Sequence, residues 1–238
     1  MDISRWPNVA AFLIFLGLSP FSYSQDYGCG SLSNHYGPFD YRTATDSLKV
    51  VEVPHFPPRV EALISGNTSM TPAGDISYTL RVFPNHHRAL MSMMKLAERE
   101  KTDRPRDSTY TMECWLERAE RFRPDDQMAK VLHGIYLAKK GKKQLALEKL
   151  DAAVELGGAS PNIDYNIGLT YFEIGQFEKS LQSAHRAYAG KFPLPGLRDK
   201  LKRAGKWQEA PSVKAESESA EAIGESAEKT QTDAEASK

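Results

Sequence analysis

The feature that most constrains the fold is a self-similarity with a period of 34 residues in the second half of the chain. The same offset relates two pairs of glycines and a series of mostly small or apolar residues: Gly134 to Gly168, Leu137 to Tyr171, Gly141 to Gly175, Lys143 to Phe177, Ala146 to Ser180, Leu150 to Ala184, and Ala153 to Ala187. A fixed period of this length indicates stacked supersecondary units, because one unit could not bury its apolar face alone. We expect Gly141 and Gly175 in tight turns between helices, where a left-handed backbone is easy only for glycine.

The run from Tyr165 to Tyr171 (YNIGLTY), followed by Gly175-Gln176-Phe177, resembles the tetratricopeptide repeat family, whose unit is a pair of antiparallel helices. The resemblance implies an all-α fold, a solenoid of helical hairpins. Repeats are expected over residues 85–124, 127–160 and 161–194, with a capping helix over 195–208. The first repeat would begin with Asn85 as helix N-cap. A long loop at 101–107 leaves its register open.

The two ends of the chain differ from this central part. Arg5 and the apolar run from Val9 to Leu18 predict a signal peptide over residues 1–24, too short to span a bilayer, which needs about 20 apolar residues. Residues 211–238 hold seven acidic residues and three lysines, and we expect this acidic tail to be disordered. The remaining residues, 25–210, carry a net charge of +4, too small to indicate a nucleic-acid partner. These patterns favour a periplasmic or secreted protein.

Residues 25–84 are rich in aromatic side chains, proline and glycine, and predict an irregular N-terminal segment with one short helix over 58–64. We expect this segment to pack on the first hairpin, with an aromatic ligand site as the alternative. The stretches 37–41, 75–87 and 192–207 together resemble a group of exported bacterial repeat proteins. That resemblance implies an extracytoplasmic location and no particular activity.

The two cysteines are Cys29 and Cys114. In an oxidising compartment an even pair is usually bonded, so a disulfide is expected. A lipidated Cys29 and a pair of free thiols are the alternatives that the sequence leaves open.

No catalytic motif is present, and the sequence predicts neither an enzyme nor a cofactor. His86 and His87, with His55, suggest a metal site. Adjacent histidines on a helix point about 100° apart, however, so they do not readily share one ion. No metal ligand is therefore assigned, and a metal-dependent or glycan-binding role for the N-terminal aromatic and histidine segment is kept as the alternative function.

The first helices of such repeats line a concave groove that holds peptides or helices in the resembled family. The repeat register places on that surface Met128, Val131, Ile135, Ala138 and Lys139 of one unit and Asn162, Tyr165, Leu169, Phe172 and Glu173 of the next. Val131 and Ile135 stand where the family's clamp for terminal carboxylates has lysine and asparagine, which argues against an acidic C-terminal peptide as ligand.

The sequence thus predicts an interaction module or scaffold that binds a peptide or helix of an envelope protein. Two possibilities stay open: the N-terminal segment or the capping helix could cover the groove. The identity of the partner and the oligomeric state are also left open.

Overall fold

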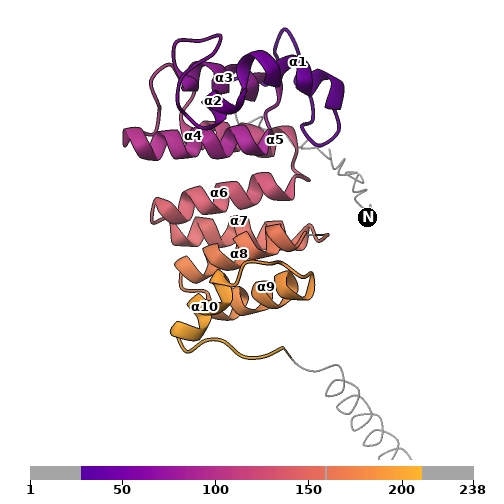
Figure 1. Ribbon diagram of the computed structural model, residues 1–238, viewed down its shortest axis with the longest axis vertical. Helices are drawn as coiled ribbons and strands as arrows, with labels where there is room; N and C mark the ends of the chain where they lie inside the picture. The colour runs from indigo at the N-terminus through magenta and orange to yellow at the C-terminus, as the bar shows by residue number, and fades with distance from the viewer. Residues whose placement is uncertain (1–27, 159, 211–238) are drawn as a thin grey trace, which may run out of the picture.

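The computed structural model describes residues 28–158 and 160–210, and the predicted signal peptide and acidic tail lie outside these residues. The described part is all-helical, with ten α-helices and no strand. The helices follow one another along the long axis of the molecule, from α1 at one end to α10 at the other (Figure 1). Their bounds are α1 Thr45–His55, α2 Pro58–Glu61, α3 Pro72–Val82, α4 His87–Glu100, α5 Met112–Phe122, α6 Gln127–Lys139, α7 Lys143–Glu155, α8 Pro161–Glu173, α9 Phe177–Ala189 and α10 Gly196–Arg203.

Two helix pairs reproduce the 34-residue period. α6 packs on α7 and α8 packs on α9, and α8 begins 34 residues after α6. Gly141 and Gly175 stand in the turns with φ of +72° and +85°, so the prediction of left-handed glycines is confirmed. The small residues predicted on the second helices are fully buried: Ala146, Ala153, Ser180, Ala184 and Ala187.

The other two glycines of the repeat allow helices to approach closely. A Cβ on Gly134 would lie 2.9 Å from Leu150 Cδ2 on α7. A Cβ on Gly168 would lie 2.5 Å from Leu197 Cδ2 on α10 and 3.2 Å from Ser183 Cβ on α9. The expected contact between first and second helix is therefore present in both pairs, and at Gly168 the closest contact is with α10.

The first helices α4, α6 and α8 contact one another in turn, while α5 packs on α6 and α7 on α8. Helix α4 begins 40 residues before α6, not 34, because the α4–α5 connection over residues 101–111 is longer. The N-cap of α4 is His86, whose Nδ1 accepts the Ala89 N–H at 3.1 Å. The prediction of Asn85 as N-cap is wrong, because Asn85 is fully buried in a polar network described below.

The N-terminal region is more helical than expected, since it contains α1 and α3 as well as α2. Thr71 caps α3 by accepting the Gly74 N–H, and Pro72 occupies its first turn. The aromatic residues of the region pack inward: Phe56 belongs to the main core, and a separate cluster holds Tyr36, Phe39, Tyr41, Tyr78 and Phe83. Among residues 28–158 and 160–210, no helix is long and apolar enough to cross a membrane.

Candidate functional site

The predicted groove residues of α8 lie under the last helix. Helix α10 packs on α8 and α9, and its Leu197 and Leu201 are buried against Tyr165. Tyr165 is only 8% exposed, and its ring lies 4.3 Å from that of Phe192. Leu169 and Phe172 are half-buried in the same cluster. In the structure, the last helix α10 therefore covers the predicted groove residues of α8, as in the alternative that the sequence left open.

Of the predicted groove residues of α6, only Lys139 is exposed. Val131 is fully buried, so it contributes to the core and not to an open surface. Met128 and Ile135 are half-buried, and Lys139 is exposed. The burial of Val131 follows from its neighbours, because α6 packs on α4, α5, α7 and α8 at once.

Helix α4 adds exposed residues to this surface, and these residues were not predicted from the sequence. Met91 is 40% exposed, and Met91, Lys95 and Glu98 recur at four- and three-residue spacing on one side of α4. Glu98 Oε1 accepts a hydrogen bond from Lys139 Nζ at 2.5 Å, which places this side of α4 beside that of α6. The 34-residue register does not predict that α4 and α6 share this surface, because the longer α4–α5 loop shifts α4 out of that register.

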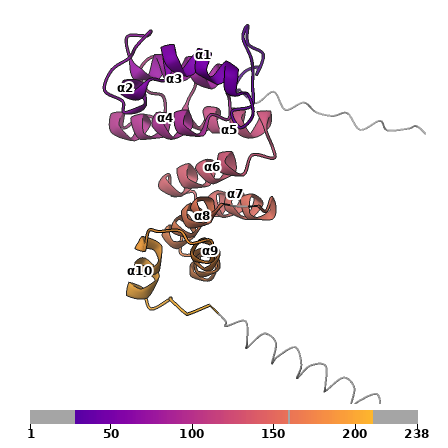
Figure 2. The ribbon, with the colours of Figure 1, turned by 45° about the vertical axis from the view of Figure 1, so that its right-hand side comes forward.

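We call the set made of Met91, Lys95, Met128, Ile135 and Lys139 the first-helix face; Met128 and Ile135 are half-buried, and the other three are exposed. It has a boundary at each end of the stack. At one end, Ser92 and Arg99 of α4 donate to the main-chain carbonyls of Glu61 and Leu63, in and just after α2. At the other end, α10 covers α8. Both α2 and α10 lie toward the left in Figure 2.

The histidines singled out from the sequence have separate acidic partners. His86 is fully buried and its Nε2 lies 2.9 Å from Glu52 Oε1. Because its Nδ1 accepts the Ala89 N–H, the proton of neutral His86 lies on Nε2 and is donated to Glu52. Burial lowers the pKa of His86, while the hydrogen bond from His86 lowers the pKa of Glu52. The Tyr41 ring stacks on His86 with 4.1 Å between centroids.

His87 faces the next hairpin. Its Nε2 lies 2.9 Å from both carboxylate oxygens of Asp126, the N-cap of α6. Asn85 donates to Asp126 Oδ2 and to Asp40 Oδ1, each at 2.8 Å, and its own Oδ1 accepts the Tyr41 N–H. This network joins the N-terminal segment to α4 and α6.

His55 makes a third, separate pair. Its Nδ1 lies 3.0 Å from Asp75 Oδ1, and its ring stacks on Tyr78. The fully buried Asp75 carboxylate also accepts the main-chain N–H groups of residues 67, 68 and 69. Within the part of the chain that the structure describes, no group of three or more histidine, cysteine, aspartate or glutamate side chains is placed to hold a metal ion.

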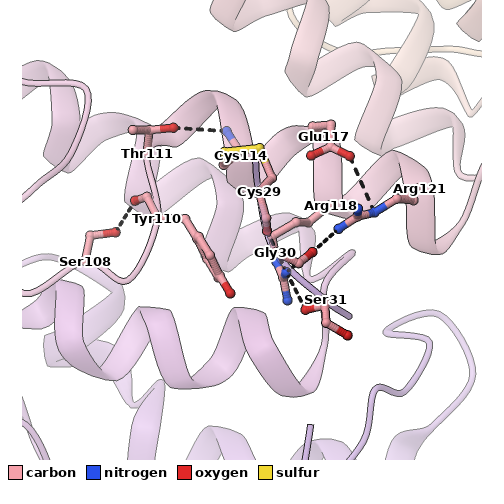
Figure 3. Close-up of a disulfide and its surroundings, with 10 residues drawn as sticks. All are labelled: Cys29, Gly30, Ser31, Ser108, Tyr110, Thr111, Cys114, Glu117, Arg118 and Arg121. Carbon is pink, nitrogen blue, oxygen red and sulfur yellow. Dashed lines mark hydrogen bonds and ion pairs between the residues drawn. A yellow bond between two sulfur atoms is a disulfide. The ribbon is translucent and has the colours of Figure 1, made fainter. Parts of the chain in front are cut away.

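The Cys29–Cys114 disulfide is present, with the two Cα atoms 5.0 Å apart (Figure 3). It holds residues 29–31 over Arg118, which is 2% exposed. Arg118 Nη1 donates to the carbonyls of Cys29, Gly30 and Ser31 at 2.9, 3.2 and 2.7 Å. Arg121 also donates to the Gly30 carbonyl. Desolvation lowers the pKa of Arg118, and the ring of Tyr110 lies 4.5 Å from its guanidinium.

Comparison with known proteins gives no match: no family model, no curated protein and no solved structure is similar to this chain.

Proposed function

We propose that this chain is an extracytoplasmic protein of the tetratricopeptide-repeat type that binds a peptide or helix of an envelope protein. The observation that carries the proposal is the first-helix face. Its apolar members come from two neighbouring first helices, α4 and α6: Met91 is exposed, and Met128 and Ile135 are half-buried. An accessible apolar strip rimmed by polar residues is typical of an interaction site.

The repeat geometry supports this type of fold. The α6–α7 and α8–α9 pairs have the same 34-residue spacing, glycine turns and small residues on the second helices. Helix α4 contacts α6 as α6 contacts α8, so α4 takes the place of the first helix of a preceding unit. A solenoid of this kind presents its first helices along one extended surface.

The chemistry of the face suits an amphipathic segment. Methionine side chains adapt to different apolar partners, and a helix laid in a groove presents apolar residues at three- and four-residue spacing. Lys95 adds a positive charge that has no ion-pair partner among the described residues. We therefore expect a partner segment with an apolar stripe and an acidic residue beside it.

The disulfide supports an extracytoplasmic location, because structural disulfides persist in oxidising compartments and are rare in the cytosol. The predicted signal peptide points the same way but lies outside the described residues.

The test uses a photo-crosslinking residue at position 135 in the native compartment, combined with Met91→Glu. The matched control is Leu145→Glu, because Leu145 is 46% exposed on α7, away from the first-helix face. We expect a discrete crosslinked protein that disappears in Met91→Glu and persists in Leu145→Glu, with both variants folded by circular dichroism. Equal capture by the two variants would contradict the proposal. Stoichiometric zinc or iron on the purified protein would instead favour the metal-dependent alternative.

A further inference from the structure

The charge of this chain is distributed unevenly at its C-terminal end. Residues 191–210 contain six basic and two acidic residues, a net charge of +4. Residues 211–238 contain seven acidic residues and three lysines, a net charge of −4. Because the whole chain has 31 basic and 31 acidic residues, residues 1–190 sum to zero. Two adjacent segments thus carry equal and opposite charge.

The six basic residues of the first segment gather around the last helix, and we call them the α10 basic surface: Lys191, Arg198, Lys200, Lys202, Arg203 and Lys206. None of them forms an ion pair with a carboxylate of the described residues. The hairpins before α10 behave differently, since Lys139, Lys149 and Lys179 each pair with an acidic side chain of another helix. The α10 basic surface therefore lacks the interhelical ion pairs that Lys139, Lys149 and Lys179 form.

An open hollow of about 750 Å³ adjoins this surface. Its lining includes the apolar side chains Phe177 and Leu181 of α9 and, from the other side, Lys206 and Gln208. The Gln208 carbonyl lies 2.8 Å from His185 Nε2, so the chain passes along α9 as it leaves the described region at residue 210. The acidic segment therefore starts beside both the hollow and the basic surface.

We propose that the acidic segment 211–238 binds in cis to the α10 basic surface, with an apolar side chain of the segment in the adjoining hollow. Its first acidic residue, Glu216, is six residues beyond Ala210 and can reach about 20 Å from it. Covalent attachment gives the segment an effective concentration on the order of millimolar at its site. Val213 and Ile223 are the apolar residues of the segment that could enter the hollow.

This occupant is favoured over an acidic partner or an anionic surface because it is always present and matches the charge of the surface. Its binding would screen six cations from other anions and would shield the last hairpin. The proposal does not depend on what binds the first-helix face, since α10 covers α8 and lies beyond one boundary of that face.

The experiment is carbodiimide crosslinking of the full chain, which joins a carboxylate directly to an amine in contact with it. Mass spectrometry then identifies which lysines are joined to the seven acidic residues of 211–238. An equimolar mixture of isotopically light and heavy protein separates links within a chain from links between chains. The variant Lys200→Gln/Lys202→Gln/Lys206→Gln is compared with Lys49→Gln/Lys101→Gln/Lys143→Gln, three exposed lysines that have no ion pair among the described residues.

We expect intrachain links concentrated on Lys200, Lys202 and Lys206. Links to Lys191, which both variants keep, should decrease in the first variant and be retained in the second. All links to the basic surface should be largely abolished in 1 M NaCl, where the Debye length falls to about 3 Å. Links spread over all exposed lysines would overturn the proposal. Links found only between chains would also overturn it, because the segment would then bind a second copy of the protein. Because the salt dependence is measured on the unaltered protein, the test does not rely on the variants folding.

Discussion

Removing the disulfide should destabilise this protein through two coupled effects. The perturbation is the double substitution Cys29→Ser/Cys114→Ser. The bridge closes a loop with a sequence separation of 85, for which the chain-entropy model gives roughly 4.6 kcal/mol. Measured losses are often smaller than this model predicts.

The second effect concerns Arg118. Its charge is buried, and its Nη1 donates to three main-chain carbonyls of residues 29–31, which the disulfide holds in place. A hydrogen bond to a charged group contributes about 1.5–3 kcal/mol. If residues 29–31 move away, water can replace them only in part, because Tyr110 and Trp115 flank the guanidinium. We therefore expect a total loss of about 4–6 kcal/mol in the free energy of unfolding.

The assay is urea unfolding followed by circular dichroism, applied to a double-mutant cycle with Arg118→Met. Arg118→Met should cost less without the disulfide than with it, because the carbonyl acceptors are then already displaced. We expect a coupling free energy of about 1–3 kcal/mol. Strictly additive losses in the double-mutant cycle would refute the link between the disulfide and Arg118. A loss below about 1 kcal/mol in the free energy of unfolding of the cysteine variant would refute the stabilising role of the disulfide.

Three further predictions concern other parts of the fold. Gly168→Ala should destabilise the last hairpin by about 1–3 kcal/mol in thermal or urea unfolding, because its Cβ would lie 2.5 Å from Leu197 Cδ2. Burial lowers the pKa of His86 in the folded protein, so the unfolded chain binds the proton more readily. The stability that neutral His86 contributes should therefore be complete above pH 6.5 and lost as the pH falls below it. His86→Asn should flatten the dependence of the urea midpoint on pH between pH 7.5 and 5. Asp75→Asn should cost about 2–4 kcal/mol in the same assay, because one buried carboxylate accepts three main-chain N–H groups, and a loss under about 1 kcal/mol would contradict that role.

The α6–α9 hairpins could be predicted from the sequence because their packing depends on residue size. Glycine and alanine at a 34-residue offset leave room for close helix contacts, and this pattern does not depend on the surface residues. The disulfide could be predicted as well, since two cysteines allow only one intrachain pairing.

Helices α1 and α3 could not be predicted in the same way. Helix α1 buries only Val51 among its eleven residues and contains Pro54 in its last turn, so it has no apolar stripe. Helix α3 buries the polar residues Asp75, Ser77 and Thr79, which a pattern of apolar spacing treats as exposed. Helix α1 therefore has no apolar periodicity, and in α3 the buried Ile76 and Leu80 stand among buried polar residues, so neither helix shows the pattern on which sequence prediction depends.

The candidate site was predicted in part, and the missing part has a physical reason. The register places Met128, Ile135 and Lys139 at seven- and four-residue spacing on α6, where the first two are half-buried and Lys139 is exposed. Whether Tyr165 and Phe172 are open depends on where α10 lies, and that is decided by residues 190–195 and by the close contact at Gly168. The path of residues 190–195 and the contact of Gly168 with α10 are not part of the 34-residue pattern.

The polar network around Asp126 bears on how the first-helix face could bind. Asp126 caps α6 by accepting the Ala129 N–H at 3.1 Å, and the same carboxylate holds His87 and Asn85 at the start of α4. Near the other ends of these helices, Lys139 pairs with Glu98. Because α4 and α6 are tied together at both ends, their apolar side chains are held in one arrangement before any partner arrives. Such an arrangement lowers the ordering cost of binding, so affinity at this face would depend mainly on the few apolar side chains that a partner buries.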